Sequence, residues 1–464
     1  MAAPDSVDWS AHEARAVRDA MKASLPRDAA RYGSDPPDRR ILYVPEGHAR
    51  ALDPDNMVVR GIRGAGKTFW WQCLQDPNLR AEVARRLPRT RLGQGWTVTP
   101  GFGGAPDDRY PTRDLLAQAL ARHPAQSIWR AVVLWAVAPG PPDLPDWLER
   151  IAWTATHPQE ASRLLRDADL AAREDPRLIV FDAVDLAATD WEALVALHRG
   201  LLEVLLDLRH TAGLRGKAFL RADLLEEPRV TGFPDASKLL RDVVDLRWTP
   251  TNLYGLLWQY LGNVRSDNGA LDPGAACFRQ LVAREVPATG PALDLDPWDV
   301  PEPARVSEAV QERLMTALAG RWMGSERRRG KVYTWLPNHL LDGRRQVSPR
   351  SFLVALQAAA EETRWEHDKP LDWQAISSGV AAASRVRVSE ISREEHGWVR
   401  LVVEPLRGLR VPVEEGDLLL RWAGDGTVDR IRDEAAVSQG PPPRHLAEGE
   451  RGLLTDLVGL GIAY

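Results

Sequence analysis

The sequence contains little cysteine and no long apolar run. Its 464 residues include two cysteines, Cys73 and Cys277, which is too few for a disulfide scaffold and suits a reducing compartment. The longest apolar stretch, residues 131–137, is far shorter than the ~20 residues that a membrane-spanning helix needs. The first residues also lack the apolar segment of a secretory signal. We therefore expect a cytoplasmic protein that has no membrane partner.

An excess of positive charge is also absent. The 60 basic and 65 acidic residues give a formal net charge of −5, which argues against a surface coated for nucleic-acid binding. The ten histidines include no pair at metal-ligand spacing, and the cysteines form no Cys-x-x-Cys motif. No serine elbow accompanies a Ser-His-Asp order. We therefore expect neither a zinc site nor a nucleophile-type hydrolase.

What the sequence does contain is an alternation of strand and helix signals over residues 57–250. Apolar and β-branched runs predict strands at residues 57–60, 96–99, 178–181, 218–220 and 243–248. Helical spacing predicts helices at residues 9–23, 69–74, 112–122, 128–138, 158–172, 191–209 and 253–261. Such alternation is typical of an α/β fold with a parallel sheet covered on both faces.

The last third of the chain has a different character. Residues 287–303 are rich in proline and acidic residues and predict a linker or surface loop. Helices predicted at residues 306–319 and 351–362 form a lid-like region. The elements expected after residue 370 are a helix, two short strands at 398–403 and 418–422, and a last helix from Gly452.

The segment GIRGAGKT, residues 61–68, lies between a predicted strand and a predicted helix, which is the context of a phosphate-binding loop. Its glycines let backbone N–H groups turn towards phosphates, and the helix N-terminus adds its positive end. Lys67 is expected to reach the β and γ phosphates and Thr68 to ligate Mg²⁺. A glycine-rich turn before a core helix would explain the glycines but not Lys67, one of only six lysines. The residues expected to contact a nucleotide are Gly61, Gly64, Ala65, Gly66, Lys67, Thr68 and Phe69.

A magnesium ion beside the phosphates needs a carboxylate held at the end of a buried strand. The segment LIVFDAVD supplies Asp182 at that position and Asp185 three residues later. We expect Asp182 to act on Mg²⁺, directly or through water, and Asp185 to orient the attacking water. The alternatives are a turn carboxylate for Asp182 and a helix cap for Asp185. Ala183 follows Asp182, so the adjacent glutamate base of many fast ATPases is absent and we expect slow hydrolysis.

Two arginines are candidates for sensing the phosphates. Arg221 ends a predicted strand beside Asp223, where it either senses the γ-phosphate or forms an ordinary surface ion pair. Arg350 follows Pro349 at the start of a predicted helix, where it either reaches over the nucleotide or lies along the helix face. Residues 321–350 contain eight basic and two acidic residues, a net charge of +6, and form the one basic concentration of the sequence.

Together these residues resemble the STAND and KAP-type P-loop ATPases, which are signal-transduction ATPases related to the AAA+ proteins. The resemblance spans about residues 55–365 and rests on GIRGAGKT, LIVFDAVD, LRADLL and SPRSFL. It implies a five-stranded sheet with an extra strand between the two motif strands, then a helical lid and often a winged helix. It also implies an ATP-dependent switch, frequently in bacterial signalling or anti-phage defence. The residues that would take nucleotide roles are Lys67, Thr68, Asp182 and Arg221, with Arg350 as a lid sensor.

The resemblance also suggests how the chain is divided. The expected regions are an N-terminal helix and linker (1–55), a P-loop NTPase core (56–265), a helical lid (266–370) and a winged-helix-like domain (371–464). The chain departs from the family at Ala183, where KAP members often have a second acid. It also lacks the transmembrane insertions of KAP members and the long repeat arrays of many STAND proteins. We therefore expect the sensor or effector to be another polypeptide.

Three functions remain open on the sequence. The first is a molecular switch that binds ATP or ADP with Mg²⁺ and acts on a protein partner, alone or as a homo-oligomer. The second is a DNA-associated ATPase of the initiator or loader type that uses residues 321–350 and a winged helix. Residues 371–464 contain eleven arginines, no lysine and fifteen acidic residues, and this balance disfavours DNA binding by that region. The third is a scaffold that binds ATP without turnover. For all three we expect the base pocket in weakly patterned segments such as residues 40–56.

Overall fold

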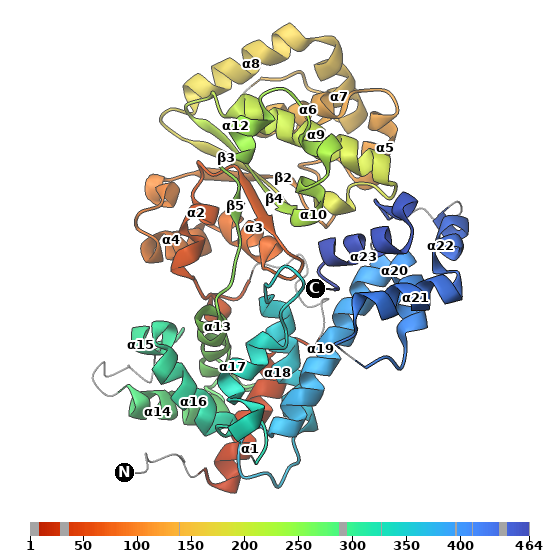
Figure 1. Ribbon diagram of the computed structural model, residues 1–464. Coiled ribbons are helices and arrows are strands. Elements are labelled where there is room, and N and C mark those ends of the chain that lie inside the picture. Colours follow the sequence, from red (N-terminus) through yellow and green to blue (C-terminus); the bar gives the residue numbers. More distant parts are fainter. Residues whose placement is uncertain are drawn as a thin grey trace.

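The computed structural model describes residues 9–27, 37–138, 140–286, 295–325, 327–394, 397–410, 412–435 and 443–463. In Figure 1 a sheet with its covering helices occupies the upper half, and a mainly helical region lies below it. The helices after residue 396 form a third group beside both. No helix in these ranges is long and apolar enough to cross a membrane.

Among the described residues, five parallel strands form one sheet in the order β2-β3-β4-β1-β5. The strands are β1 (Val58–Gly61), β2 (Thr97–Phe102), β3 (Arg177–Phe181), β4 (Leu214–Arg221) and β5 (Val244–Asp245). All five predicted strands are therefore present, although β5 is shorter than residues 243–248. Because β4 lies between β1 and β3, the prediction of an extra strand between the two motif strands is confirmed.

Helices cover both faces of the sheet, as predicted. One face packs against α3 (Lys67–Gln75) and α4 (Pro77–Arg86), and the other against α6 (Ala125–Val137) and α9 (Trp191–Leu208). Alternate residues of β3 face the two layers, since Val180 belongs to the first cluster and Phe181 to the second. The remaining helices of this sheet region are α2 (Ala49–Leu52), α5 (Arg113–Leu120), α7 (Trp147–Thr156), α8 (Pro158–Ala171), α10 (Ala222–Leu225), α11 (Pro228–Thr231) and α12 (Ala236–Leu240).

The region below the sheet is built from distant parts of the sequence. Its helices are α1 (Ala11–Ser24), α13 (Pro250–Gly262), α14 (Pro273–Glu285), α15 (Glu302–Val306), α16 (Glu308–Ala319), α17 (Val332–Asn338) and α18 (Pro349–Glu362). The N-terminal helix α1 packs against α14 and α18, and its buried Arg18 donates to the carbonyls of Trp365, His367, Lys369 and Pro370. The N-terminal helix therefore packs within the region predicted as the lid.

The predicted linker at residues 287–303 is only partly a loop. Residues 287–294 lie outside the described residues, but Trp298 is 1% exposed. Gln259 of α13 and Asn263, the residue after that helix, both donate to the Trp298 carbonyl. Residues 295–303 thus pack against α13, because a tryptophan among the prolines supplies a large apolar anchor.

The C-terminal part corrects the sequence analysis. Its helices are α19 (Trp373–Glu394), α20 (Gly397–Val403), α21 (Glu415–Asp425), α22 (Thr427–Ala435) and α23 (Glu450–Gly459). The strands predicted at 398–403 and 418–422 are wrong, since both segments are helical. Trp398, Val399 and Val402 are buried on one helix face while Arg400 is exposed, and short apolar runs do not distinguish the two structures. The described part of this region contains no strand that could form the wing of a winged helix.

Candidate functional site

The loop between β1 and α3 has a backbone that requires glycine at two positions. Gly64 and Gly66 have φ angles of 75° and 96°, in the left-handed region that residues with a Cβ avoid. At Gly64 a Cβ would also lie 2.9 Å from the Ser348 Oγ and 3.0 Å from the Arg350 Cβ. The loop therefore turns sharply into α3 and touches the first turn of α18.

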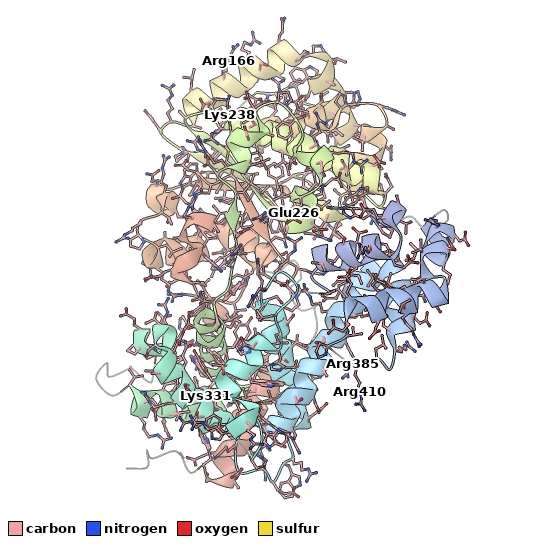
Figure 2. The ribbon with its side chains drawn as sticks, in the orientation of Figure 1. Arg166, Glu226, Lys238, Lys331, Arg385 and Arg410 are labelled. Carbon is pink, nitrogen blue, oxygen red and sulfur yellow. The ribbon has the colours of Figure 1, made fainter. Side chains whose placement is uncertain are left out.

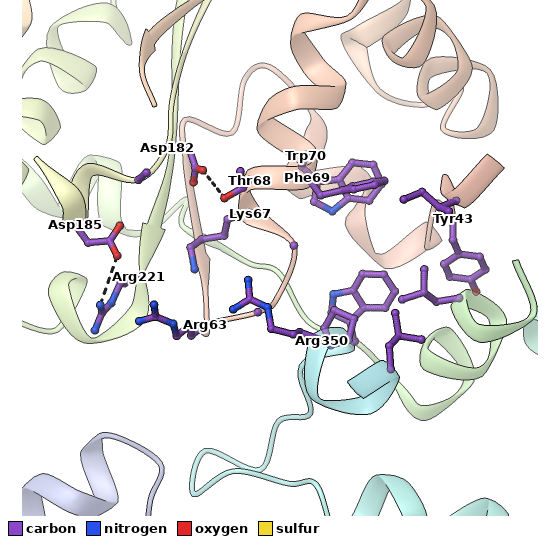
Figure 3. Close-up of a pocket in the computed structure, with 18 of the residues that line it drawn as sticks. Tyr43, Arg63, Lys67, Thr68, Phe69, Trp70, Asp182, Asp185, Arg221 and Arg350 are labelled. Carbon is purple, nitrogen blue, oxygen red and sulfur yellow. Dashed lines mark hydrogen bonds and ion pairs between the residues drawn. The ribbon is translucent and has the colours of Figure 1, made fainter. Parts of the chain in front are cut away.

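Lys67 and Thr68 begin α3 at the carboxyl edge of the sheet. The Nζ of Lys67 donates to the carbonyls of Gly61 and Ile62, each at 3.1 Å. The Oγ1 of Thr68 donates to Oδ2 of Asp182 at 2.6 Å, as Figure 3 shows. Burial lowers the pKa of Lys67, and the nearby carboxylates of Asp185 and Asp182 oppose that shift. The loop and the end of β3 thus meet although 114 residues separate Thr68 from Asp182.

Asp182 follows the last residue of β3 and is 2% exposed. Burial raises the pKa of this carboxyl from 3.8 to about 6, although the hydrogen bond from Thr68 and the charge of Lys67 lower it. Ala183 has a φ angle of 55°, so the chain turns sharply after Asp182. This turn brings Asp185 to the same cleft.

Arg221 ends β4, between the two motif strands. It forms ion pairs with Asp223 at 2.7 Å and with Asp185 at 3.5 Å. Burial lowers the pKa of Arg221, but these two carboxylates outweigh that effect and leave it raised. The side chain is 13% exposed, so the alternative of an ordinary exposed surface pair does not describe it.

Arg350 lies in the first turn of α18, whose N-terminus is capped by the side chain of Ser348. Its Nη1 lies 3.4 Å from Oε1 of Glu390 on α19. Arg63, from the loop itself, lies 3.6 Å from the other oxygen of Glu390. Both arginines line the same cleft as Lys67, so Arg350 does reach the loop rather than lie along the helix face.

These side chains line a cleft of about 460 Å³ that has two chemically different ends. The polar end is lined by Arg63, Lys67, Thr68, Asp182, Asp185, Arg221 and Arg350, and the apolar end by Ile41, Tyr43, Trp248, Leu256, Tyr260 and Leu353. Tyr43 lies at the opposite side of the cleft from Asp185 and Arg221 (Figure 3). The Trp248 Nε1 donates to the Ala65 carbonyl at 2.8 Å, which fixes the floor of the apolar end.

Most of the predicted site residues meet here. Gly64, Gly66, Lys67, Thr68, Phe69, Asp182, Asp185, Arg221 and Arg350 all line the cleft. Gly61 and Ala65 do not; Ala65 is 1% exposed, and Gly61 lines a smaller cavity beside Arg221. Arg63 and most of the apolar end were not predicted from the sequence. Arg63 could have been noticed as the second charged residue, besides Lys67, inside GIRGAGKT, whereas Leu256 and Tyr260 look like ordinary core residues of α13.

The basic concentration at residues 321–350 does not form one surface. Arg321 and Arg327 lie over the Trp322 ring, Lys331 pairs with Glu312, and Arg344 pairs with Glu226. Figure 2 shows Lys331 low in the helical region and Glu226 beside the C-terminal helices. The positive charges are therefore spread over separate places, and several are neutralised by acidic partners.

The donor set at the polar end fits Mg²⁺. The Thr68 hydroxyl and the Asp182 carboxylate are hard oxygen donors 2.6 Å apart, close to the about 2.9 Å between adjacent oxygens of an octahedral ion with bonds of about 2.0–2.1 Å. In the described part of the chain, no group of three or more His, Cys, Asp or Glu side chains is placed to hold a metal ion. Such a site suits an ion that takes its other ligands from phosphates and water.

Comparison with known proteins adds no family to this picture. No protein-family model matches the sequence, and no curated protein is significantly similar to it.

Proposed function

We propose that this chain binds ATP, or ADP after hydrolysis, with Mg²⁺ in the cleft and works as a nucleotide-dependent switch. The observation that carries the proposal is the 2.6 Å contact between Thr68 and Asp182. It joins a glycine-rich loop that follows β1 and precedes a helix to the carboxylate at the end of β3, which is separated from β1 by β4. A cleft with a cationic end and an apolar end beside this contact suits a phosphate chain attached to a base.

The loop and its lysine would hold the phosphates. Backbone N–H groups of Gly64 and Gly66 in the loop and of Lys67 and Thr68 at the start of α3 would offer donors to anionic oxygens, and Lys67 would exchange its two carbonyl partners for phosphate. Thr68 and Asp182 would hold Mg²⁺, which neutralises phosphate charge when bound. Ile41, Tyr43, Leu256, Tyr260 and Leu353 would enclose the base. Ile41 and Tyr43 belong to the segment expected to form the base pocket.

Turnover would depend on Asp185 and Arg221. Asp185 lines the cleft beyond Asp182 and would orient water or accept its proton, and Arg221 would stabilise charge that develops on the terminal phosphate. In the structure the two side chains pair with each other at 3.5 Å, so each must partly release the other. Ala183 offers no second carboxylate. We therefore propose slow hydrolysis, as suits a switch whose state persists.

We rank a switch that acts on a protein partner above a DNA-associated ATPase. The basic residues that would contact DNA are dispersed, and Lys331 and Arg344 are paired with acidic residues. The described C-terminal residues have no wing strands. Signalling or anti-phage defence is the setting that the resemblance to STAND and KAP ATPases suggests, and a protein partner or a second copy would read the nucleotide state.

The test is calorimetric binding of ATP to the purified chain, with Mg²⁺ and with chelator, for wild type and Thr68→Val. Thr156→Val is the matched control, because Thr156 is an exposed residue at the end of α7 whose hydroxyl bonds to its own helix and to His157. We expect wild type and Thr156→Val to bind Mg·ATP about tenfold more tightly than Thr68→Val. When a chelator removes Mg²⁺, the three proteins should bind ATP with similar affinity. Wild type that does not bind ATP, or that binds equally after Thr68→Val, would contradict the proposal.

A further inference from the structure

Two arginines at the polar end of the cleft share one carboxylate. Arg350 of α18 and Arg63 of the loop lie 3.4 and 3.6 Å from the two oxygens of Glu390 on α19. The Glu390 side chain is 11% exposed, so the contact is largely removed from water. One carboxylate thus joins three segments that are far apart in the sequence, at the place where the proposed phosphates would lie.

Glu390 is placed to offset the positive charges of both Arg63 and Arg350. Arg221 has Asp185 and Asp223 as ion-pair partners. Arg387, one turn before Glu390 on α19, pairs with Asp342 at 3.3 Å. Glu390 lies against Arg63 and Arg350, and both of these arginines line the cleft. Phosphate oxygens that enter the polar end would meet guanidinium groups already engaged by a carboxylate.

We propose that Glu390 sets the discrimination between nucleoside triphosphates and monophosphates by competing with the terminal phosphates for Arg63 and Arg350. This inference rests on the proposed function, which places the phosphates at the polar end. A guanidinium group binds carboxylate and phosphate through the same fork of N–H donors, so the two anions are rivals for it. A triphosphate brings enough charge to displace Glu390, whereas a monophosphate gains less from doing so.

The competition between Glu390 and the phosphates links the cleft to the C-terminal helices. Glu390 lies near the end of α19, which packs against α18 and then against α20. Linkage requires that the free energy by which Glu390 weakens triphosphate binding equals the free energy by which the triphosphate weakens the hold on Glu390. Glu390 is therefore a positioning residue that acts through the two arginines, and triphosphate binding loosens the end of α19.

The experiment uses the full chain with three variants. Glu390→Gln removes the competing charge, Glu390→Asp retains it, and Glu312→Gln breaks a different carboxylate–cation pair, with Lys331 at 2.7 Å, outside the cleft. Affinities are measured by calorimetry for AMP, ADP and a non-hydrolysable ATP analogue with Mg²⁺. Amide hydrogen exchange over residues 384–391 is measured with and without the analogue.

We expect Glu390→Gln to bind the triphosphate analogue about tenfold more tightly than wild type, with AMP affinity changed less than about twofold. Glu390→Asp restores most of the wild-type ratio of triphosphate to AMP affinity, and Glu312→Gln leaves it unchanged. The analogue should raise amide exchange at residues 384–391 in wild type but not in Glu390→Gln. An unchanged or lower triphosphate affinity in a folded Glu390→Gln overturns the inference while leaving the proposed function intact, whereas no binding of any nucleotide by wild type overturns both.

Discussion

Lys67 and Lys217, both in the sheet region, have similar bonds but very different surroundings. Each amine donates to two backbone carbonyls, those of Gly61 and Ile62 for Lys67, and those of Ala51 and Asn56 for Lys217. Lys217 is 0% exposed, whereas Lys67 lines the open cleft. Burial lowers the pKa of both lysines, and that of Lys217 reaches about 7.

In the proposed function, this difference separates a structural lysine, Lys217, from a phosphate-binding lysine, Lys67. Lys217 lies near the amino end of β1, buried from solvent and bonded to the carbonyls of Ala51 and Asn56. Lys67 lies at the carboxyl edge of the same sheet, among Asp182, Asp185 and Arg221, with open volume beside it. The carboxyl edge is also where open parallel sheets bind ligands. Side chains there have polar partners that a ligand could replace, and this supports the proposal that the cleft binds a ligand.

The largest expected effect is the change that Lys217 causes in the free energy of unfolding as the pH rises. Because its pKa falls from 10.5 to about 7 in the folded chain, the unfolded chain holds more protons between these values. The free energy of unfolding should therefore rise with pH from about 7 to 10, by at most about 1.4 kcal/mol per pH unit. Chemical denaturation of wild type and Lys217→Met across this range measures it. Parallel curves for the two proteins would show that Lys217 is not deprotonated by folding.

At the carboxyl edge, Asp182→Asn should uncouple nucleotide binding from magnesium. The amide still accepts the bond from Thr68 and preserves the volume, so thermal unfolding should change little. The affinity for Mg·ATP should fall roughly 10- to 100-fold, because the carboxylate charge that would balance the ion is lost. A titration of MgCl₂ at fixed ATP measures this, and an unaltered magnesium dependence would place the ion elsewhere.

A smaller expected effect is a loss of Mg·ATP affinity at low pH, when the Asp182 carboxylate becomes protonated. The pKa of Asp182 is raised to about 6, so the carboxylate that would hold Mg²⁺ becomes protonated as the pH falls below that value. Affinity for Mg·ATP should be constant above about pH 7 and fall by up to tenfold per pH unit below about 6. Asp182→Asn supplies the baseline, since phosphates also titrate near pH 6. Identical pH profiles for the two proteins would remove Asp182 from this role.

The smallest predicted effect comes from Arg221→Gln. The guanidinium must leave Asp185 and Asp223 to reach a phosphate, so its net contribution is less than that of a free arginine. Affinity for a non-hydrolysable ATP analogue should fall about fivefold, with ADP affinity nearly unchanged. Competition binding measures the ratio of the affinities for the analogue and for ADP. Equal losses of affinity for both nucleotides would mean that Arg221 maintains the shape of the cleft and does not contact the terminal phosphate.

The sheet and the polar end of the cleft were predictable from the sequence because their signals are local. Four apolar residues before Asp182 indicate a buried strand, and the glycines and lysine of residues 61–68 indicate a phosphate-binding turn. The resemblance to STAND and KAP ATPases implied five strands with an extra strand between the two motif strands, and β4 does lie between β1 and β3. The roles of these residues in binding and turnover stay predictions.

The apolar end and the C-terminal helices were not predictable because they depend on long-range packing. Tyr43 and Tyr260 meet in one cleft although nothing in their local sequence distinguishes them from core residues. Residues 398–403 contain β-branched residues that favour a strand, but packing against the surrounding helices makes the segment helical. The contact of Glu390 with Arg63 joins positions more than 300 residues apart, which no local pattern reports.

The most direct test of the account compares Lys67→Ala and Lys217→Met for binding of Mg·ATP by calorimetry. We predict a single site in wild type, a loss of affinity of roughly 100-fold in Lys67→Ala, and affinity close to wild type in Lys217→Met. Binding by Lys67→Ala that is as tight as that of the wild type would contradict the assignment of the cleft as a nucleotide site.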